Sequence, residues 1–504
     1  MKCDEQILYY LENNYKTLND KNNILIENSL PFHLYPDFEN KSTKKSILSN
    51  RIYELATQKE IAKINKVFFK NNISAIFFKG LVLSHQLYPK TYMRKVGDID
   101  LFVLEGSFET AANILLNLGY NFSKPEKMSA DHHVVLNNDM FFIELHKSIY
   151  HPMIGVEENY LKSNINLMKI NDESLLTFNT TATLLHLIYH LYMDTYLSAG
   201  SLYNIFANKT IPKAGRFFYR AYEIALFSEK YYNQIKWEDI IEDIKKQKLR
   251  ISFKKMIMDI LEIFPNTFPE SFIDMVFQHE YIEDERDQLY KFLINAEIKT
   301  NDNIDSILSD YIDVNWDKRI GKNIHKKSGE SILLTKKSED GENEDISCNV
   351  ETKKTTEGLR IIFKVSNSDL SISEINDYNT LGSDGVHLLL CGTEKYSYKS
   401  IFFFPKLIDD EIKIVVCDVL NNKNTILGDD LINADFYKTD NNYTIIANIK
   451  NRFLEENHLK TYFYMGLVIS DCNRETHYRK NQLILSEIES YWYNPVYFAR
   501  IDMQ

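Results

Sequence analysis

Two aspartates stand one residue apart in the segment "RKVGDIDLFV", directly before an apolar run. Alternate residues of a β-strand face the same side, so Asp98 and Asp100 would point the same way. Two adjacent carboxylates repel each other unless a positive charge lies between them. Carboxylate oxygens suit Mg²⁺, so the pattern predicts a divalent-metal site at the start of a buried strand. The alternative is a solvated loop before that strand.

The segment "FFKGLVLSHQLYP" suits a phosphate group, because a predicted strand runs into Lys79-Gly80 and a helix begins there. Free N–H groups at a helix start attract phosphate, and glycine lets the backbone approach a ligand closely. Lys79 adds a full charge, and Arg94 offers a planar fork for phosphate oxygens. The alternative is a tight strand-to-helix turn that binds nothing.

A third acidic residue lies in "FFIELHKS", where Glu144 interrupts a strongly apolar strand. A buried glutamate needs a partner or a metal ion. His146 lies two residues on and shares the face of Glu144. The alternative is that Glu144 faces solvent.

Two pairs of histidines are further candidates. His132 and His133 begin a predicted strand, where one of them could face a cleft or both could lie at the surface. His186 and His190 are four residues apart on a predicted helix, a spacing that can bind a metal ion. No carboxylate pattern completes that second pair, so we expect it to pack or to form hydrogen bonds.

Hydrophobic periodicity predicts a multidomain α+β protein. Residues 1–45 read as an N-terminal helical segment. Residues 46–155 alternate helices and strands in a compact α/β unit that carries the candidate site residues. Residues 156–320 repeat apolar positions every three to four residues and predict a helical domain. From 330 to 504 the period shifts to two, which is typical of a β-sandwich.

Composition limits the classes of function. The chain has 504 residues and a net charge of -12, which argues against a protein that wraps nucleic acid. Its five cysteines form no CxxC pair and fit reduced thiols better than a disulfide framework. No secretory signal is evident, and no stretch reaches the ~18 apolar residues of a membrane span. We expect a soluble, cytoplasmic protein that has no membrane partner.

The motifs together resemble a known family. Over residues 46–315, the order "KG", "YP", "R", "GDIDLFV" and "ELH" resembles the uncharacterised bacterial nucleotidyltransferases of the DNA polymerase β-type superfamily. This resemblance implies a polymerase β-type α/β domain followed by a helical domain. Related proteins tend to show an arginine and an aspartate on a helix, and the nearest pair here is Arg220 and Glu223.

The resemblance also implies an activity. Asp98, Asp100 and Glu144 would hold two Mg²⁺ or Mn²⁺ ions, and Glu144 would help to deprotonate the attacking hydroxyl. The triphosphate of a nucleoside triphosphate would lie against Lys79, Arg94 and the backbone of Gly80 and Leu81. Leu81 replaces the small residue that is usual after the glycine, but backbone donation is retained. The expected enzyme moves a nucleoside monophosphate to an acceptor hydroxyl and releases pyrophosphate.

The C-terminal region resembles a different family. The segments "DGVHLLL" at 384–390, a late "SD" and "WYNPVYFARI" at 492–501 resemble family 9-type carbohydrate-binding modules. Such modules stack aromatic rings on sugars, so Trp492 would either contact a glycan or pack the sandwich. The acceptor could therefore be a small molecule, a sugar or a peptide. The sequence leaves open the base, the acceptor, the pathway and the oligomeric state. It also leaves open an enzyme that adenylylates proteins, or a catalytically inactive adaptor that binds nucleotide or glycan.

Overall fold

The structure is a computed structural model, and the part of the chain that it describes has gaps. Described are residues 2–14, 30–31, 34, 41–95, 97–104, 107–123, 132–150, 156–197, 217–282, 287–295, 308, 311–312, 325–327, 329–334, 347–366, 385–392, 397–408, 411–418, 425–439, 442–459, 461–472, 479–484 and 499–503.

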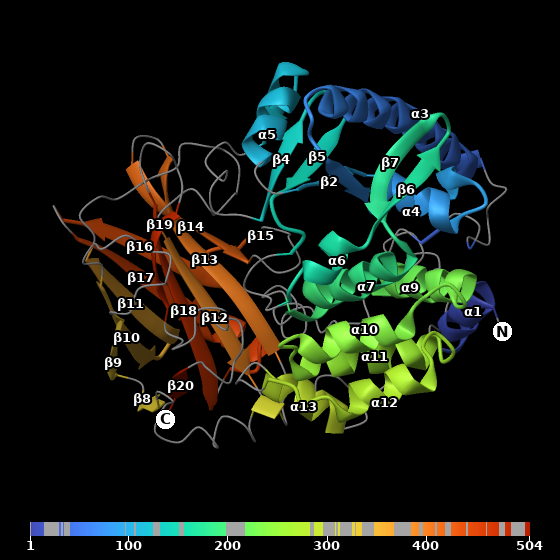
Figure 1. Cartoon of the computed structure of the whole chain (residues 1–504). Coiled ribbons are helices and arrows are strands. Elements are labelled where there is room, and N and C mark those ends of the chain that lie inside the picture. The colour runs from blue at the N-terminus through green and yellow to red at the C-terminus, as the bar shows by residue number, and fades with distance from the viewer. Residues whose placement is uncertain are drawn as a thin grey trace. The chain divides into compact units, whose positions relative to one another are not determined.

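The chain divides into two compact units (Figure 1). Unit 1 comprises residues 1–198 and 212–300, and unit 2 comprises residues 199–211 and 301–504. The α/β part and most of the helical part, which the sequence separates at residue 155, both lie in unit 1. The boundary between those two parts stays a prediction.

A seven-stranded mixed sheet forms the centre of unit 1, with strand order β3-β4-β5-β2-β1-β7-β6. All four strands predicted from the sequence of the α/β part are confirmed. The hairpin β6–β7 lies in the range predicted to be helical, and this difference has a physical reason. Its Ile170 and Leu175 are buried in the core of the sheet, while Asn171 takes the left-handed φ of 52° that its tight turn requires. The strands are β1 (Ala75–Phe78), β2 (Ile99–Val103), β3 (Asn121–Phe122), β4 (His133–Asn137), β5 (Phe142–His146), β6 (Ile165–Ile170) and β7 (Glu173–Phe178).

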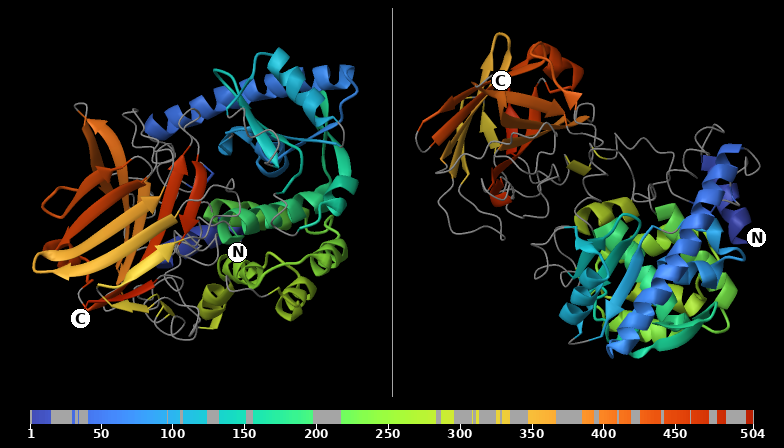
Figure 2. Two further views of the ribbon diagram at one scale, coloured as in Figure 1. Left: turned by 90° about the vertical axis from the view of Figure 1, so that its left-hand side faces the viewer. Right: turned by 90° about the horizontal axis from the view of Figure 1, so that it is seen from above.

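One face of this sheet is apolar and covered by two helices. The long helix α3 (Lys41–Lys70) and the helix α5 (Phe108–Asn117) pack on residues such as Leu101 and Ile143 (Figure 2). Because side chains alternate along a strand, the residues between these positions face the other side. The opposite face therefore carries the polar residues of β2 and β5.

The remaining helices of unit 1 follow the predicted helical pattern. Asn179 caps α7, because its side chain accepts a hydrogen bond from the Ala182 N–H at 2.9 Å. The N-terminal helix α1 packs on α9, where the Tyr222 hydroxyl donates to Asp4 at 2.5 Å. These elements are α1 (Cys3–Asn14), α4 (Gly80–Leu87), η2 (Thr91–Met93), α6 (Asn159–Ser163), α7 (Thr180–Leu191), the π-helix η5 (Tyr192–Leu197), α9 (Phe217–Tyr231), α10 (Trp237–Lys246), α11 (Ile251–Ile263), α12 (Glu270–Gln278) and α13 (Asp287–Asn295).

Unit 2 holds two sheets, of five and eight strands, and one apolar core contains side chains from both. This arrangement is the predicted β-sandwich. The strands that the period of two predicted are confirmed. Its elements are β8 (His325–Lys327), β9 (Ser331–Leu334), β10 (Ser347–Thr355), β11 (Gly358–Ser366), β12 (Gly385–Gly392), β13 (Ser397–Ile408), β14 (Glu411–Asp418), β15 (Thr425–Ile426), β16 (Ile432–Lys438), β17 (Asn442–Lys450), α15 (Asn451–Glu456), β18 (Tyr462–Cys472), β19 (Arg479–Ile484) and β20 (Ala499–Asp502).

Several residues that carry the carbohydrate-module resemblance, Asp384, Trp492, Asn494 and Pro495, lie outside the described residues. Whether Trp492 contacts a glycan or packs the core therefore stays a prediction. Among the helices that the structure describes, none combines the length and the apolar character that crossing a membrane would require.

Candidate functional site

The predicted site residues meet in one cleft of unit 1, with a volume of about 600 Å³. This volume falls within the roughly 300–1,000 Å³ of small-molecule sites. Its floor is the polar face of the sheet, and its walls come from the start of α4 and from α7, η5 and α9. Among the lining residues are Lys79, Gly80, Arg94, Asp98, Asp100, His132, His133, Glu144, His146, His190, Asp194, Tyr219, Arg220 and Glu223.

The turn between β1 and α4 has an unusual backbone. Lys79 has a φ of 56°, which is rare for a residue with a side chain, and Gly80 has a φ of 33°. A Cβ atom on Gly80 would lie 3.0 Å from the carbonyl oxygen of Asp98, so glycine is favoured here on two grounds. Leu81 is buried in the apolar core and does not line the cleft, so the contact of its backbone with phosphate stays a prediction. Strained turns of this kind concentrate at functional sites.

Asp100 and Glu144 are neighbours across two parallel strands. Residues Ile99 to Phe102 of β2 pair with Ile143 to His146 of β5, and this register places Asp100 opposite Glu144. The Asp100 carboxylate is 3% exposed, and its Oδ1 accepts a hydrogen bond from Lys79 Nζ at 2.9 Å. The alternative of a solvated loop therefore does not hold for this aspartate, because Asp100 lies within the sheet.

Burial and nearby charges shift the pKa of the two aspartates in the cleft. Burial acts to raise the pKa of the Asp100 carboxyl, but the Lys79 ammonium and the His146 imidazole together hold it well below its usual range. Burial also raises the pKa of Asp98 to about 6, and the negative charges of Asp100 and Glu144 add to this shift. The Asp98 carboxyl therefore resists ionisation, first because it is buried and second because two other acids lie near it.

The ligand atoms of Asp100, Glu144 and His146 all lie within 4.8 Å of one another. His146 Nε2 is 3.5 Å from Asp100 Oδ1 and 3.6 Å from Glu144 Oε2. Asp100 and Glu144 are thus close enough to share one ion. Asp98 lines the same cleft, but among the described residues it belongs to no such group.

The predicted metal fits these residues. Two carboxylates that share a face and lie opposite each other provide the oxygen ligands that Mg²⁺ requires. A third carboxylate, Asp98, lines the same cleft, and its raised pKa shows that further positive charge would stabilise its ionised form. The residues present therefore suit a divalent cation, and their roles as its ligands stay a prediction.

Arg94 lines the cleft, and other groups of the protein hold its guanidinium. It is 8% exposed, its Nε donates to Glu223 Oε1 at 2.7 Å, and its Nη1 donates to the Gly80 carbonyl at 3.2 Å. The Tyr88 hydroxyl donates to the same Glu223 carboxylate at 3.1 Å. Arg94 therefore braces the glycine turn against α9. Its contact with phosphate oxygens stays a prediction.

Helix α9 contributes more to the cleft than the sequence suggested. Tyr219, Arg220 and Glu223 all line it, and Arg220 forms an ion pair with Asp194 of the π-helix η5. Asp194 and Tyr219 were not predicted. The sequence signal that could have pointed to this part of the cleft was the pair of charged residues in the otherwise apolar run "FFYRAYEIALF".

The histidines divide into two groups. His186 is 2% exposed, its Nδ1 lies 3.0 Å from the Tyr150 hydroxyl, and its ring stacks on His190 at 5.5 Å. This pair has the packing and hydrogen-bonding role that we predicted. His190 also lines the cleft, as do His132 and His133, which lie next to His146.

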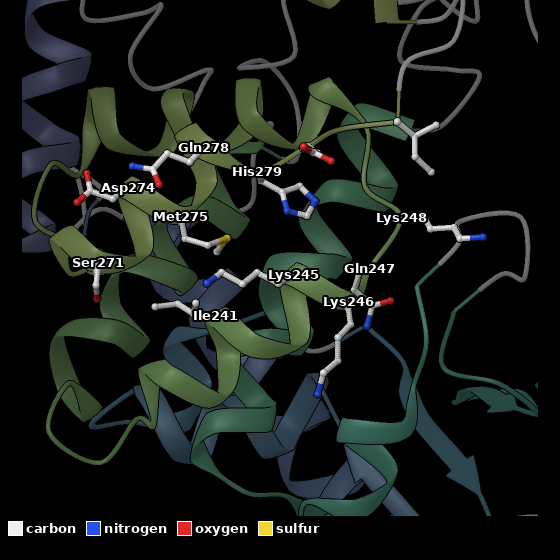
Figure 3. A pocket seen from close by; sticks show the side chains of 12 residues that line it. Ile241, Lys245, Lys246, Gln247, Lys248, Ser271, Asp274, Met275, Gln278 and His279 are labelled. Carbon is white, nitrogen blue, oxygen red and sulfur yellow. The ribbon is translucent and has the colours of Figure 1, made fainter.

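A second cavity lies away from the acidic residues, between α10 and α12 (Figure 3). Its volume is about 820 Å³, and its lining includes Lys245, Lys246, Lys248 and His279. None of the three predicted acidic residues lines it. Larger volume alone does not identify a chemical site, so we place the candidate site in the cleft of the carboxylates.

Comparison with known proteins agrees with the motifs. A family model described as uncharacterised nucleotidyltransferase matches residues 29–264, which confirms that resemblance. No curated protein matches the chain.

Three solved structures are similar to parts of the chain. A family 9 carbohydrate-binding module from Caldicellulosiruptor kristjanssonii in complex with cellotriose is 12% identical, with 36% of this chain and 94% of that chain covered and a TM-score of 0.25. A putative carbohydrate-binding protein from Bacteroides uniformis is 9% identical, covering 35% and 86%, with a TM-score of 0.27. An antigenic nucleotidyltransferase-like protein from Paracoccidioides brasiliensis is 11% identical, covering 46% and 94%, with a TM-score of 0.23.

Proposed function

We propose that this protein is a nucleotidyltransferase that depends on Mg²⁺ or Mn²⁺ and moves a nucleoside monophosphate from a nucleoside triphosphate to an acceptor hydroxyl. The observation that carries the proposal is the pairing of Asp100 with Glu144, opposite the Lys79-Gly80 turn and in one cleft. The family match over residues 29–264 supports the same class of reaction.

The residues of the cleft would have different roles in binding the substrate. Lys79 and the N–H groups at the start of α4 would hold the phosphates, because a helix N-terminus and a lysine both favour anions. Asp98, Asp100 and Glu144 would hold the divalent cation, which supplies charge to the phosphate oxygens when bound. Arg94 keeps the turn in place through its bonds to Gly80 and Glu223.

The reaction balances without a further reagent. The acceptor oxygen forms a bond to the α-phosphorus, and the bond from that phosphorus to the bridging oxygen of the β-phosphate breaks. Pyrophosphate leaves with the electron pair of that bond. The hydroxyl proton passes to the Glu144 carboxylate, which is partly exposed and so lies within reach of an acceptor that enters the cleft.

The test is release of pyrophosphate by the full chain, with each labelled nucleoside triphosphate, Mg²⁺ or Mn²⁺, and a cell extract that supplies acceptors. We expect metal-dependent release by the unaltered protein and none by the double variant Asp98→Asn, Asp100→Asn. Asp172→Asn, in the exposed turn between β6 and β7, is the matched control and should behave as the unaltered protein.

Mass analysis of the labelled product then identifies the acceptor and shows whether it is a small molecule, a sugar or a protein. Nucleotide binding without turnover in either form would indicate a binding protein and would end the enzyme proposal. Equal turnover by the double variant and the unaltered protein would move the chemistry away from this cleft.

A further inference from the structure

Three imidazole rings meet at one edge of the cleft. His133 pairs with His146 in the antiparallel register of β4 and β5, so both side chains lie on the same face of the sheet. The ring centroids of these two residues are 5.0 Å apart, and that of His132 lies 4.3 Å from His133 and 5.8 Å from His146. One ligand atom from each ring can be chosen so that all three lie within 4.8 Å of one another.

The backbone holds this arrangement in place. The carbonyl oxygen of His132 accepts hydrogen bonds from the N–H groups of Lys147 and Ser148, at 2.8 and 3.1 Å. These bonds join the start of β4 to the end of β5, two strands that lie side by side in Figure 1. The Phe78 ring contacts the His146 ring edge to face at 5.1 Å and limits its rotation. The rings are therefore positioned before any ligand binds.

His146 is the most buried of the three histidines. It is 2% exposed, and within the described part of the chain neither of its ring nitrogens makes a hydrogen bond. Its contacts to the carboxylates of Asp100 and Glu144 are longer, at 3.5 and 3.6 Å. A buried polar atom without a hydrogen bond is costly, so this position suits a ligand that it can coordinate.

Imidazole nitrogen points to a particular class of ion. It binds Zn²⁺, Co²⁺ and other transition metals, whereas Mg²⁺ prefers oxygen ligands. Two nitrogens on one tetrahedral Zn²⁺ ion are about 3.3 Å apart, so side-chain movements of about 1.5 Å would close a group whose ligand atoms lie within 4.8 Å. His132 Nε2 and His133 Nδ1 are 2.9 Å apart, a hydrogen-bonding distance, and an ion bound by both nitrogens would replace that bond.

We infer that His132, His133 and His146 form a binding site for a transition-metal ion, beside the carboxylates of Asp100 and Glu144. This site is separate from the Mg²⁺ role assigned to the carboxylates. It does not depend on the proposed nucleotidyl transfer, because three imidazoles can bind the ion in a protein that turns over no nucleotide.

The experiment uses the full chain after removal of bound metal with a chelator and of any histidine tag, and the probes are Zn²⁺ and Co²⁺ alone. We expect about one Zn²⁺ ion per chain after gel filtration, by elemental analysis. Co²⁺ should give the visible absorption bands of nitrogen ligation. The double variant His132→Gln, His133→Gln should bind Zn²⁺ at least about 10- to 100-fold more weakly, since the loss of even an outer-shell partner has an effect of that size.

Two control variants test whether a change in Zn²⁺ affinity is specific to the three histidines. His85→Gln removes a partly buried histidine that is bonded to Gln58 and belongs to neither group of potential ligands, so its Zn²⁺ affinity should match the unaltered protein. Asp98→Asn should remove pyrophosphate release and change Zn²⁺ affinity by less than about 10-fold, because Asp98 lies outside both groups. Circular dichroism confirms that each variant folds.

Two results would overturn the inference. One is Zn²⁺ affinity no greater than Mg²⁺ affinity, which would leave these residues as a hydrogen-bonded network only. The other is unchanged Zn²⁺ affinity in a folded His132→Gln, His133→Gln variant. Failure of nucleotidyl transfer alone, with Zn²⁺ binding intact, would reject the proposed function and leave the metal site standing.

Discussion

The guanidinium of Arg94 is bonded to the carboxylate of Glu223, at 2.7 Å between Nε and Oε1, across 129 residues of sequence. Both side chains are buried, at 10% and 2% exposure, and the Arg94 Cζ also lies 5.3 Å from the centre of the Tyr219 ring. Because Arg94 also bonds to the Gly80 carbonyl, this pair joins the helical part of unit 1 to the turn of the candidate site.

Removal of Glu223 should destabilise unit 1. Glu223→Ala leaves a buried guanidinium without its counter-charge, which typically costs about 3–5 kcal/mol. Hydrogen exchange should therefore accelerate in the amides of α4 and α9, and the free energy of unfolding should fall.

The matched control for that change is Glu242→Ala, which breaks an exposed pair with Lys246. Solvent screens the attraction between exposed charges, so this variant should be nearly neutral. Similar losses in both variants would show that Arg94 and Glu223 do not brace the turn.

The Lys79-Gly80 turn should tolerate no side chain at its second position. Gly80→Ala adds a Cβ 3.0 Å from the Asp98 carbonyl, in a backbone conformation that already costs about 1–2 kcal/mol for other residues. We expect a loss of stability and weaker nucleotide binding, measured by urea unfolding and calorimetry.

Gly119→Ala separates the cost of the backbone conformation from the steric contact of the added Cβ atom. Gly119 has a φ of 92° but open space around a built Cβ, so its substitution carries the backbone cost alone. Its nucleotide affinity should equal that of the unaltered protein. Equal nucleotide affinity in Gly80→Ala would remove the turn from the binding site.

Lys79 should matter to nucleotide binding far more than the neighbouring Lys95. Charge-assisted hydrogen bonds contribute about 1.5–3 kcal/mol, so Lys79→Ala should weaken binding of a nucleoside triphosphate by roughly 10- to 100-fold. Lys95 lines the same cleft but is exposed, and Lys95→Ala should change affinity by only a few fold. A larger effect at Lys95 in a calorimetric titration would contradict this assignment.

The sandwich core should depend on its interior aromatic residues. Phe363 is fully buried, and its ring lies 5.9 Å from that of Phe403 in the facing sheet. Phe363→Ala should lower the free energy of unfolding of unit 2 by about 3–5 kcal/mol. Leu333→Ala, at a position 67% exposed, should change it by less than about 0.5 kcal/mol. Denaturant unfolding of the two variants provides the comparison.

Local patterns in the sequence were enough to place most of the elements. The period of two in "NYTIIANI" and the period of three to four in "TATLLHLIYHL" arise within a few residues, and both became the predicted strand and helix. The hairpin β6–β7 was missed because its alternation is weak, with Leu167 at the edge of the sheet and 65% exposed. The hairpin joins the sheet through the parallel pair of Ile76 and Leu176, which connects strands far apart in the chain.

For the candidate site as well, the sequence predicted the local features and did not predict which residues are neighbours in space. The sequence alone predicted that Asp98, Asp100, Glu144 and His146 lie on strands, which holds for all of them except Asp98, directly before β2. It also predicted which of them share a face, because alternation along a strand is a local property. Only the tertiary structure decided that Asp100 lies opposite Glu144, that Arg94 turns toward Glu223, and that His132 and His133 approach His146. Strand order and register set these neighbours, and both depend on packing between segments that the sequence does not place side by side.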